Sequence, residues 1–411
     1  MAKGPLERAR AEELDAADPL RGYRDLFAFA DPSLIYLNGN SLGALPKATL
    51  ARLDRVIREE WGTALVRSWE HWVDLPYQAG DLVGELIGAA PGQVVVTDNT
   101  TVNLYKLICA ALDTRPGRRV IVTDRDNFPS DRYVMEGIAA QRGAELRMLD
   151  TDIDRGPSAD EVRAAVDSGT AVVSLSHVAY RSGALADMAA ITQIAHEAGA
   201  LMLWDLCHSV GAVPIELDGC DVDLAVGCTY KYLNSGPGAP AFLYVSARLQ
   251  ESLRQPVWGW FSQRDQFAMG PAYDPAPGIA SFMTGTPTIL GTAAVAESVR
   301  LLLEAGIGPM RAKSVQLTSY LIELADAWLA PLGCELATPR DPGRRGGHVT
   351  FRHPQAEQIV AQLAAANIVT DYRTPERFRL GMSPLYSRFT DLWTAAGTAR
   401  DIIESKLGRQ P

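Results

Sequence analysis

Between about residues 90 and 250, short apolar runs alternate with segments whose apolar residues recur at helical spacing. Such runs are typical of strands buried on both faces, and the intervening segments are typical of amphipathic helices. We expect strands at 119–123, 145–149, 171–175, 200–204, 223–226 and 241–245. Strands and helices that alternate in this way predict an α/β fold with a mostly parallel sheet.

Two of the predicted helices have recognisable ends. Residues 101–112 (TVNLYKLICAAL) have apolar positions at helical spacing, and Thr100 or Thr101 is expected to cap the helix. The helix predicted at 187–198 is followed by Gly199, a residue that commonly ends a helix before the next strand.

The pattern changes towards both ends of the chain. The first 60 residues or so are charged and helical, interrupted by the turn-rich YLNGNSLGALP. After Gly291 helices predominate, with short strands at 348–352 and 378–380. We therefore expect three parts, an N-terminal helical segment (1–60), a large α/β domain (61–290) and a small C-terminal α+β domain (291–411).

Composition narrows the class of protein. The 411 residues are 47% hydrophobic and 21% charged, with a net charge of −10, which argues against nucleic acid or an anionic membrane as a partner. No apolar run approaches the roughly 18 residues of a membrane span, and the charged N-terminus lacks the apolar stretch of a signal peptide. The five cysteines form no CxxC pair and do not cluster with the six histidines, so we expect reduced thiols, a cytoplasmic protein and no metal site.

Candidate chemical residues follow the ends of three predicted strands. Ser176 and Asp205 come directly after two of them, and Lys231, in CTYKYLNSGPG, comes a few residues after a third. The carboxyl ends of parallel strands share one sheet edge, where ligands bind. A lysine that loses its proton can form a Schiff base, and an aspartate can hold a pyridine nitrogen, the pairing that pyridoxal phosphate needs. Taken alone, a buried aspartate is more often a capping or salt-bridged group.

Other motifs could complete such a site. Thr100 and Thr101 in DNTTVNL begin a helix, where an anion such as a phosphate is stabilised, although an ordinary N-cap is equally consistent. Phe128, in FPSDRY, offers a ring face to a cofactor. His208, in DLCHSVG, could reach the cofactor, although a structural histidine is the commoner case. The glycine-rich segments lack both GK[ST] and a GxGxxG after a strand, so nucleotide binding is a weak alternative.

Taken together, DLCHSVG, CTYKYLNSGPG, FPSDRY and YLNGNSLGALP resemble kynureninase, a pyridoxal-phosphate family of fold-type I, from about Tyr36 to Tyr386. The resemblance implies a large domain with a mostly parallel seven-stranded sheet, and a homodimer with shared active sites. It implies that Lys231 forms the Schiff base and moves the Cα proton, that Asp205 binds the pyridinium nitrogen and that Tyr230 relays a proton. The remaining cofactor-binding residues it implies are Thr100, Thr101, Phe128, Ser130, Asp131, Ser176 and His208, with Trp260 and Thr286 reaching the phosphate of the partner subunit.

For the substrate, the resemblance implies that Arg379 holds the α-carboxylate and that the loop with Gln263 lies close to the substrate. Trp72 is also predicted to bind the substrate, although core packing is the commoner role for Trp72 and Trp260 alike. Two positions depart from the family, which usually has Gly-His at Ser262-Gln263 and alanine at Cys207. Gln263 could hydrogen-bond a ring hydroxyl of the substrate, since one hydroxyl is discriminated strongly only by a pocket group that pairs with it.

The implied reaction is hydrolysis of L-kynurenine, or a ring-substituted kynurenine, to an anthranilate and L-alanine. The unsubstituted substrate would indicate tryptophan catabolism, and a 3-hydroxy substrate would indicate synthesis of NAD or a specialised metabolite. A cysteine desulfurase-like lyase is an alternative, but it needs a nucleophilic cysteine on a mobile loop. A third interpretation is a non-catalytic sensor domain that binds the cofactor. Such a domain is usually fused to a basic DNA-binding segment.

Overall fold

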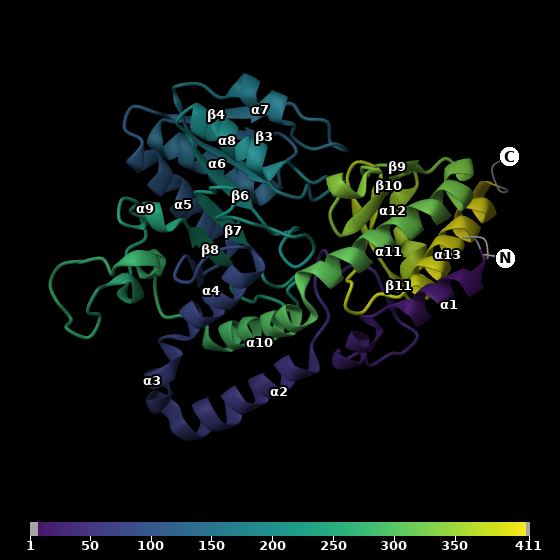
Figure 1. Ribbon diagram of the computed structural model, residues 1–411, viewed down its shortest axis with the longest axis horizontal. Helices are drawn as coiled ribbons and strands as arrows, with labels where there is room; N and C mark the ends of the chain where they lie inside the picture. The colour runs from purple at the N-terminus through teal and green to yellow at the C-terminus, as the bar shows by residue number, and fades with distance from the viewer. Residues whose placement is uncertain (1–6, 408–411) are drawn as a thin grey trace.

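The computed structural model describes residues 7–407 and has two bodies, one of which is built around a seven-stranded sheet (Figure 1). Its strands lie in the order β2-β8-β7-β6-β5-β3-β4. The bounds are β2 Val94–Val96, β3 Val120–Asp124, β4 Glu145–Leu149, β5 Thr170–Ser176, β6 Leu201–Asp205, β7 Leu224–Gly227 and β8 Phe242–Val245. Only β8 runs against its neighbours, so the mostly parallel sheet predicted from the sequence is confirmed.

Alternate residues of each strand face two different cores. On β3, Ile121 packs with α5 and α6, whereas Val122 packs in the core that contains α4, α7, α8 and α10. This period of two is the geometry of a strand covered on both faces. The helices are α4 Leu75–Leu86, α5 Thr100–Thr114, α6 Pro129–Arg142, α7 Ala159–Ala165, α8 Met188–Glu197 and α10 Ile289–Ala305.

The second body is built around a four-stranded antiparallel sheet in the order β12-β13-β10-β9. Its strands are β9 Glu335–Leu336, β10 His348–Arg352, β12 Asp371–Arg373 and β13 Arg377–Gly381. The helices packed with this sheet are α11 Ile307–Trp328, α12 Ala356–Ala365 and α13 Phe389–Leu407. The predicted C-terminal helices and strands are therefore present, with β9 and β12 as strands that the sequence pattern did not indicate.

The N-terminal segment is divided between the two bodies. Helix α1 (Arg8–Ala17) lies beside α13 in Figure 1, and β1 (Ile35–Tyr36) pairs in parallel with β11 (Ile368–Val369). Ala11 and Leu37 belong to the same hydrophobic core as α11 and α13. The chain then crosses to the large body through α2 Lys47–Arg55, a π-helical turn Val56–Ala64, a 3-10 turn Leu65–Ser68 and α3 Trp69–Trp72, and the remaining short helix is α9 Ala247–Gln250.

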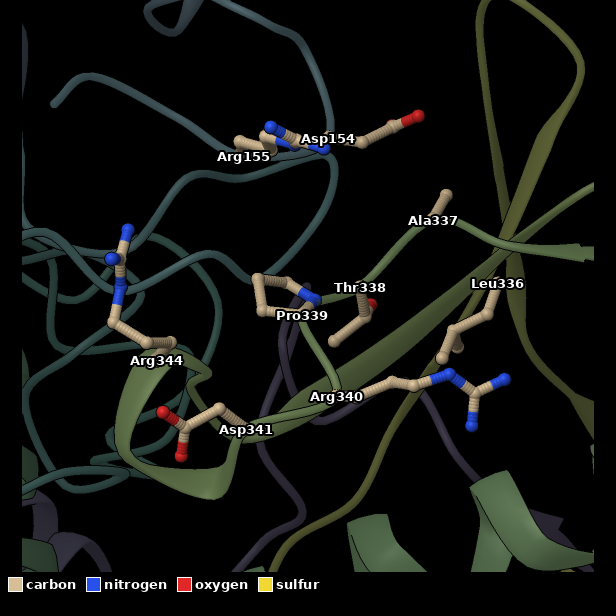
Figure 2. Close-up of a pocket in the computed structure, with 9 residues that line it drawn as sticks. All are labelled: Asp154, Arg155, Leu336, Ala337, Thr338, Pro339, Arg340, Asp341 and Arg344. Carbon is tan, nitrogen blue, oxygen red and sulfur yellow. The ribbon is translucent and has the colours of Figure 1, made fainter.

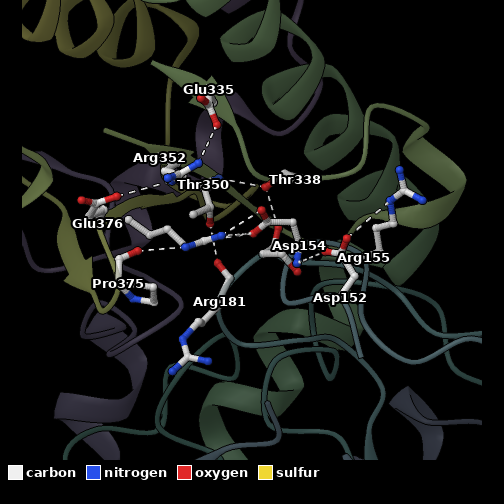
Figure 3. A network of polar contacts seen from close by, with 12 residues as sticks. Asp152, Asp154, Arg155, Arg181, Glu335, Thr338, Thr350, Arg352, Pro375 and Glu376 are labelled. Atoms are coloured by element: carbon white, nitrogen blue, oxygen red, sulfur yellow. Dashed lines mark hydrogen bonds and ion pairs between the residues drawn. The ribbon is translucent and has the colours of Figure 1, made fainter. Parts of the chain in front are cut away.

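Polar contacts join the two bodies (Figure 3). The guanidinium of Arg377 on β13 donates to both oxygens of Asp154, at 2.9 and 2.8 Å, and the Thr350 hydroxyl donates to the carbonyl of Arg181. A cavity of about 350 Å³ opens beside this network, between Asp154 and the segment that follows β9 (Figure 2). None of the predicted site residues lines it. Within residues 7–407, no helix is both long and apolar enough to cross a membrane.

Candidate active site

The segment around Lys231 is held in place by the N-terminal NSLG turn. Gly43 N donates to the carbonyl of Tyr230 at 2.8 Å, and Asn234 N donates to that of Lys231 at 2.9 Å. A Cβ at Gly43 would lie 2.3 Å from the Lys231 carbonyl oxygen, so the turn needs glycine to approach so closely. Two motifs far apart in the sequence thus form one structure, which fixes where the lysine begins.

The side chain of Lys231 lies in a buried environment of rings. Its Nζ is 3.0 Å from Nε2 of His208, 5.6 Å from the ring centroid of Phe128 and 5.8 Å from that of Tyr230. Lys231 is only 8% exposed. The amine therefore faces an aromatic surface with a single hydrogen-bond acceptor at close range, and no carboxylate lies within salt-bridge distance of it among the residues described.

Asp205, the last residue of β6, is oriented from two sides. Its Oδ1 accepts a hydrogen bond from Cys207 N at 2.8 Å, and its Oδ2 lies 3.2 Å from the Ser176 hydroxyl at the end of β5. Ser176 Oγ also lies 2.8 Å from Oδ1 of Asn127, so the hydroxyl proton can go to either acceptor. Ser176 and Asp205 therefore both lie at strand ends, as inferred from the sequence, and Ser176 helps to orient Asp205.

The N-terminus of α5 forms another wall. Asn99, rather than either threonine, caps the helix, because its side chain accepts from Val102 N at 3.0 Å. The predicted cap was wrong by one residue, since an asparagine just before the helix caps at least as well as threonine. Thr100 and Thr101 instead occupy the first turn, where the amides and the helix dipole favour an anion.

These walls enclose a cavity of about 150 Å³. The predicted residues that line it are Thr100, Thr101, Phe128, Ser130, Asp131, Asp205, His208, Tyr230 and Lys231. Asn99 and Cys207 also line it and were missed as site residues. Asn99 lies beside Thr100 in DNTTVNL, and Cys207 lies beside His208 in DLCHSVG, so closeness to a predicted site residue could have indicated both.

Burial sets the protonation states of the cavity. It raises the pKa of Asp131 well above its usual range, and the neighbouring charge of Asp205 adds to the effect. Burial and the positive charge of Lys231 lower the pKa of His208, so its imidazole is neutral and its Nε2 can accept from the lysine. Burial also raises the pKa of Tyr230, which keeps the phenol protonated.

Arg379 is not part of this cavity wall. It lies on β13, 1% exposed, and its Nε donates to Oδ1 of Asp371 at 2.7 Å. Its Nη2 also bonds to Asp371, and its Nη1 donates to the carbonyl of Tyr180. One edge of the guanidinium fork is therefore already occupied by a carboxylate of the chain.

The other predicted residues lie away from the chain's own cavity. Trp260 is 43% exposed and, with Gln263, lines a surface groove of about 450 Å³, where Gln263 accepts from Asp274 N at 2.8 Å. Thr286 is exposed just before α10. Trp72 is buried beside α10, and its indole donates to Glu60 at 2.8 Å.

The donor set fits pyridoxal phosphate. Two buried polar atoms of residues that line the cavity, Nδ1 of His208 and Oδ2 of Asp131, have no hydrogen-bond partner within the described chain. An amine, an oriented carboxylate, an aromatic face and a helix N-terminus surround the same space. Across residues 7–407, no three histidine, cysteine or acidic side chains are grouped as metal ligands.

Known proteins resemble this chain in sequence. The family described as "Kynureninase C-terminal domain" matches residues 310–398, and the "DegT/DnrJ/EryC1/StrS aminotransferase family" matches residues 83–217. Kynureninase from Burkholderia pseudomallei (strain K96243) is 44% identical over 98% of this chain and 97% of its own length. Kynureninase from Pseudomonas fluorescens is 44% identical over 97% of this chain and 95% of its own.

Solved structures share the fold at lower identity. The apo structure of a cysteine desulfurase from Thermococcus onnurineus NA1 has a TM-score of 0.80 at 19% identity, covering 96% of this chain and 98% of its own. A C-DES mutant with glycine covalently linked to its PLP cofactor has a TM-score of 0.78 at 19% identity, covering 90% and 97%.

The fold is that of the fold-type I enzymes. The residues of the cavity and the similarity to kynureninases define an enzyme of this class that uses pyridoxal 5'-phosphate. Since relatives 44% identical span almost the whole sequence, the chain belongs to the kynureninase family.

Proposed function

We propose that this chain hydrolyses the Cβ–Cγ bond of L-kynurenine, or of a ring-substituted kynurenine, to an anthranilate and L-alanine. The observation that carries the proposal is the buried cavity in which Lys231, Asp205 and Phe128 meet the N-terminus of α5. Near full-length similarity to kynureninases supports the choice of this reaction among those of the fold.

The cofactor, when bound, supplies an electron sink for the charge that develops at the substrate carbons. Asp205, oriented by Cys207 N and Ser176, would hold the ring nitrogen in its protonated form. Thr100 and Thr101 would bind the phosphate at the first turn of α5, and Phe128 would cover one ring face.

Lys231 is the residue that we expect to take and return the Cα proton. Nε2 of His208, 3.0 Å from Nζ, accepts a hydrogen bond and orients the amine. Tyr230 retains its phenolic proton because its pKa is raised, so it can donate that proton as the Cβ–Cγ bond breaks. The cavity buries these groups, which strengthens the electrostatic interactions among them.

Arg379 is our candidate for binding the substrate α-carboxylate. Its guanidinium is bonded to Asp371 and to the carbonyl of Tyr180, so a substrate carboxylate would have to displace part of the present pairing. Ser41 Oγ lies 3.3 Å from Nη2 and gives the site a neutral hydrogen-bonding neighbour.

We also propose a cytoplasmic homodimer. Trp260 and Thr286 lie outside the chain's own cavity, and an exposed Trp260 beside a surface groove is suited to contact a second subunit. In this arrangement, Trp260 and Thr286 reach the phosphate of the partner subunit, and Gln263 and Trp72 bind the substrate.

The division into 1–60, 61–290 and 291–411 stays a proposal. The shared core of Ala11 and Leu37 with α13 favours assigning the start of the chain to the C-terminal body.

A desulfurase-like reaction has less support. Such a reaction needs a cysteine that can move to the substrate. Cys207 is the cysteine that lines the cavity among the residues described, and its Sγ is fixed by a hydrogen bond from Cys228 N at 3.2 Å. The likeness to desulfurases at 19% identity concerns the fold.

The test is kcat/KM for L-kynurenine and 3-hydroxy-L-kynurenine, measured side by side on protein loaded with pyridoxal phosphate, with product release followed by fluorescence. We expect one of the two to be cleaved well, and their ratio separates catabolic from biosynthetic use. Cofactor binding without cleavage of either substrate would contradict the proposed reaction.

A further inference from the structure

Two cysteines meet at the base of the cavity. Cys207 follows β6 and Cys228 follows β7, two adjacent parallel strands that keep their register to the end, since Leu206 N still donates to the carbonyl of Val226 at 2.8 Å. Cys228 N donates to Sγ of Cys207 at 3.2 Å, and Sγ of Cys228 lies 3.8 Å from the carbonyl oxygen of Cys207. The two thiols therefore lie side by side.

The pair differs from an ordinary buried thiol in its surroundings. Cys207 lines the cavity, so small solutes that enter the cavity reach it. Interaction with the Cys228 side chain and burial both raise the pKa of Cys207. Burial alone would raise the pKa of Cys228, but the bond with Cys207 and the charge of Lys231 bring it below its usual range. Proton sharing and a nearby ammonium are the conditions under which a cysteine becomes reactive.

We propose that Cys207 and Cys228 form an oxidation site that closes to a disulfide in the cofactor-free chain. Hydrogen peroxide enters the cavity, and the Cys207 thiol that lines it attacks the peroxide to give a sulfenic acid and water. The Cys228 thiolate then displaces the hydroxyl group as hydroxide, forming the S–S bond, and the hydroxide takes up the proton that Cys228 had released, making a second water. Two thiols lose two electrons in total, and the peroxide is reduced to two molecules of water.

Cofactor binding protects the pair. This part rests on the proposed function, whereas disulfide formation itself does not. The cofactor would fill the cavity that gives access to Cys207, and it would bind Lys231 covalently, removing the ammonium beside Cys228. An oxidant would then form the disulfide in the cofactor-free chain and leave both thiols reduced in the loaded chain.

The experiment treats the full chain with dilute hydrogen peroxide, with and without pyridoxal phosphate, followed by alkylation and peptide mass spectrometry. Trypsin is unsuitable because residues 182–231 contain no internal lysine or arginine, leaving Cys207, Cys220 and Cys228 in one peptide. An endopeptidase that cuts before aspartate separates all three, since Asp218 and Asp221 lie between them. We expect the peptides of Cys207 and Cys228 to be joined, two hydrogens lighter, and to separate on treatment with dithiothreitol.

Controls separate the two parts of the inference. Cys220→Ala, a half-buried cysteine outside the cavity, should leave the cross-link unchanged, whereas Cys207→Ala should remove it. Cross-linking should be about tenfold slower in the loaded chain. Two free thiols in the oxidised cofactor-free chain would overturn the oxidation site. Equal rates with and without cofactor would overturn the protection, while leaving the disulfide itself established.

Discussion

Carboxylates are buried in two regions of this chain, with opposite electrostatic outcomes. Around the active-site cavity, burial raises the pKa of Asp131 well above its usual range and that of Asp124 to about 7. In the C-terminal body, burial would likewise raise the pKa of Asp371, but the hydrogen bonds and the charge of Arg379 hold it below its usual range. Hydrogen bonds and a positive charge offset the cost of burying the carboxylate of Asp371, whereas the cost of burying that of Asp131 is not offset.

The difference lies in how completely the polar atoms are paired. Both oxygens of Asp371 bond to Arg379, and one of them also accepts from Ser41 at 2.7 Å. In the cavity, one oxygen of Asp131 and one nitrogen of His208 have no partner in the described chain. Because uncompensated burial costs free energy, these two atoms, in side chains that line the same cavity as Lys231, support a site for a polar ligand there.

The largest effect is expected from Asp205→Asn. A neutral amide at the end of β6 cannot stabilise a protonated ring nitrogen, so kcat should fall by about a thousandfold. Ser176→Ala, which removes one hydrogen bond to Asp205, should cost only about tenfold. Steady-state kinetics on cofactor-saturated protein measures both values of kcat. Equal losses of kcat in the two variants would contradict the role of Asp205 at the ring nitrogen.

Asp371→Asn should affect stability more than any change in the cavity. It leaves the buried guanidinium of Arg379 without its charge partner, at a cost of about 3 kcal/mol in the free energy of unfolding. Urea unfolding at pH 7 measures this, with Arg373→Gln as the control, because the Arg373 side chain is 34% exposed and should cost less.

The sign of the pH dependence follows from the lowered pKa of Asp371. Its contribution to stability is complete above the unfolded pKa of about 3.9 and is lost as the pH falls through the lower folded value. The difference between native and Asp371→Asn protein should therefore shrink below pH 4. A difference that persists unchanged there would show that the pairing does not depend on charge.

Asp124→Asn should stabilise the chain, the opposite of Asp371→Asn. Burial raises the pKa of Asp124 to about 7, so the folded state holds a proton that the unfolded state releases between pH 4 and 7. Stability is lost as the pH rises through that window, and the asparagine should recover roughly 2 kcal/mol at pH 8. Asp150→Asn, whose side chain is 81% exposed, should change stability little at either pH.

Sequence patterns predicted the sheet and much of the cavity because strand-end residues gather wherever strands run parallel. Asp205 and Lys231 were placed by this rule and do line one cavity. The pattern gave no sign of β2, since three valines are too short to distinguish from a loop, or of the pairing of β1 with β11 across some 330 residues.

Contacts between side chains from distant segments could also not be predicted from the sequence pattern. Nothing in the spacing of Arg379 indicated that Asp371 occupies its fork, or that Trp72 turns its indole towards Glu60. Such pairings depend on how helices and strands of different parts of the chain meet, which a local pattern does not record.

Identifying the lysine that binds the cofactor tests the proposed role of Lys231. Two lysines of the cofactor-binding body are buried, Lys231 in the cavity and Lys106 on α5, whose ammonium pairs with Asp98 at 2.7 Å. The chain is loaded with pyridoxal phosphate, reduced with borohydride to fix the covalent bond, and mapped by peptide mass spectrometry. We expect the label on Lys231 alone. A label on Lys106, or none on Lys231 in protein that retains cofactor, would contradict it.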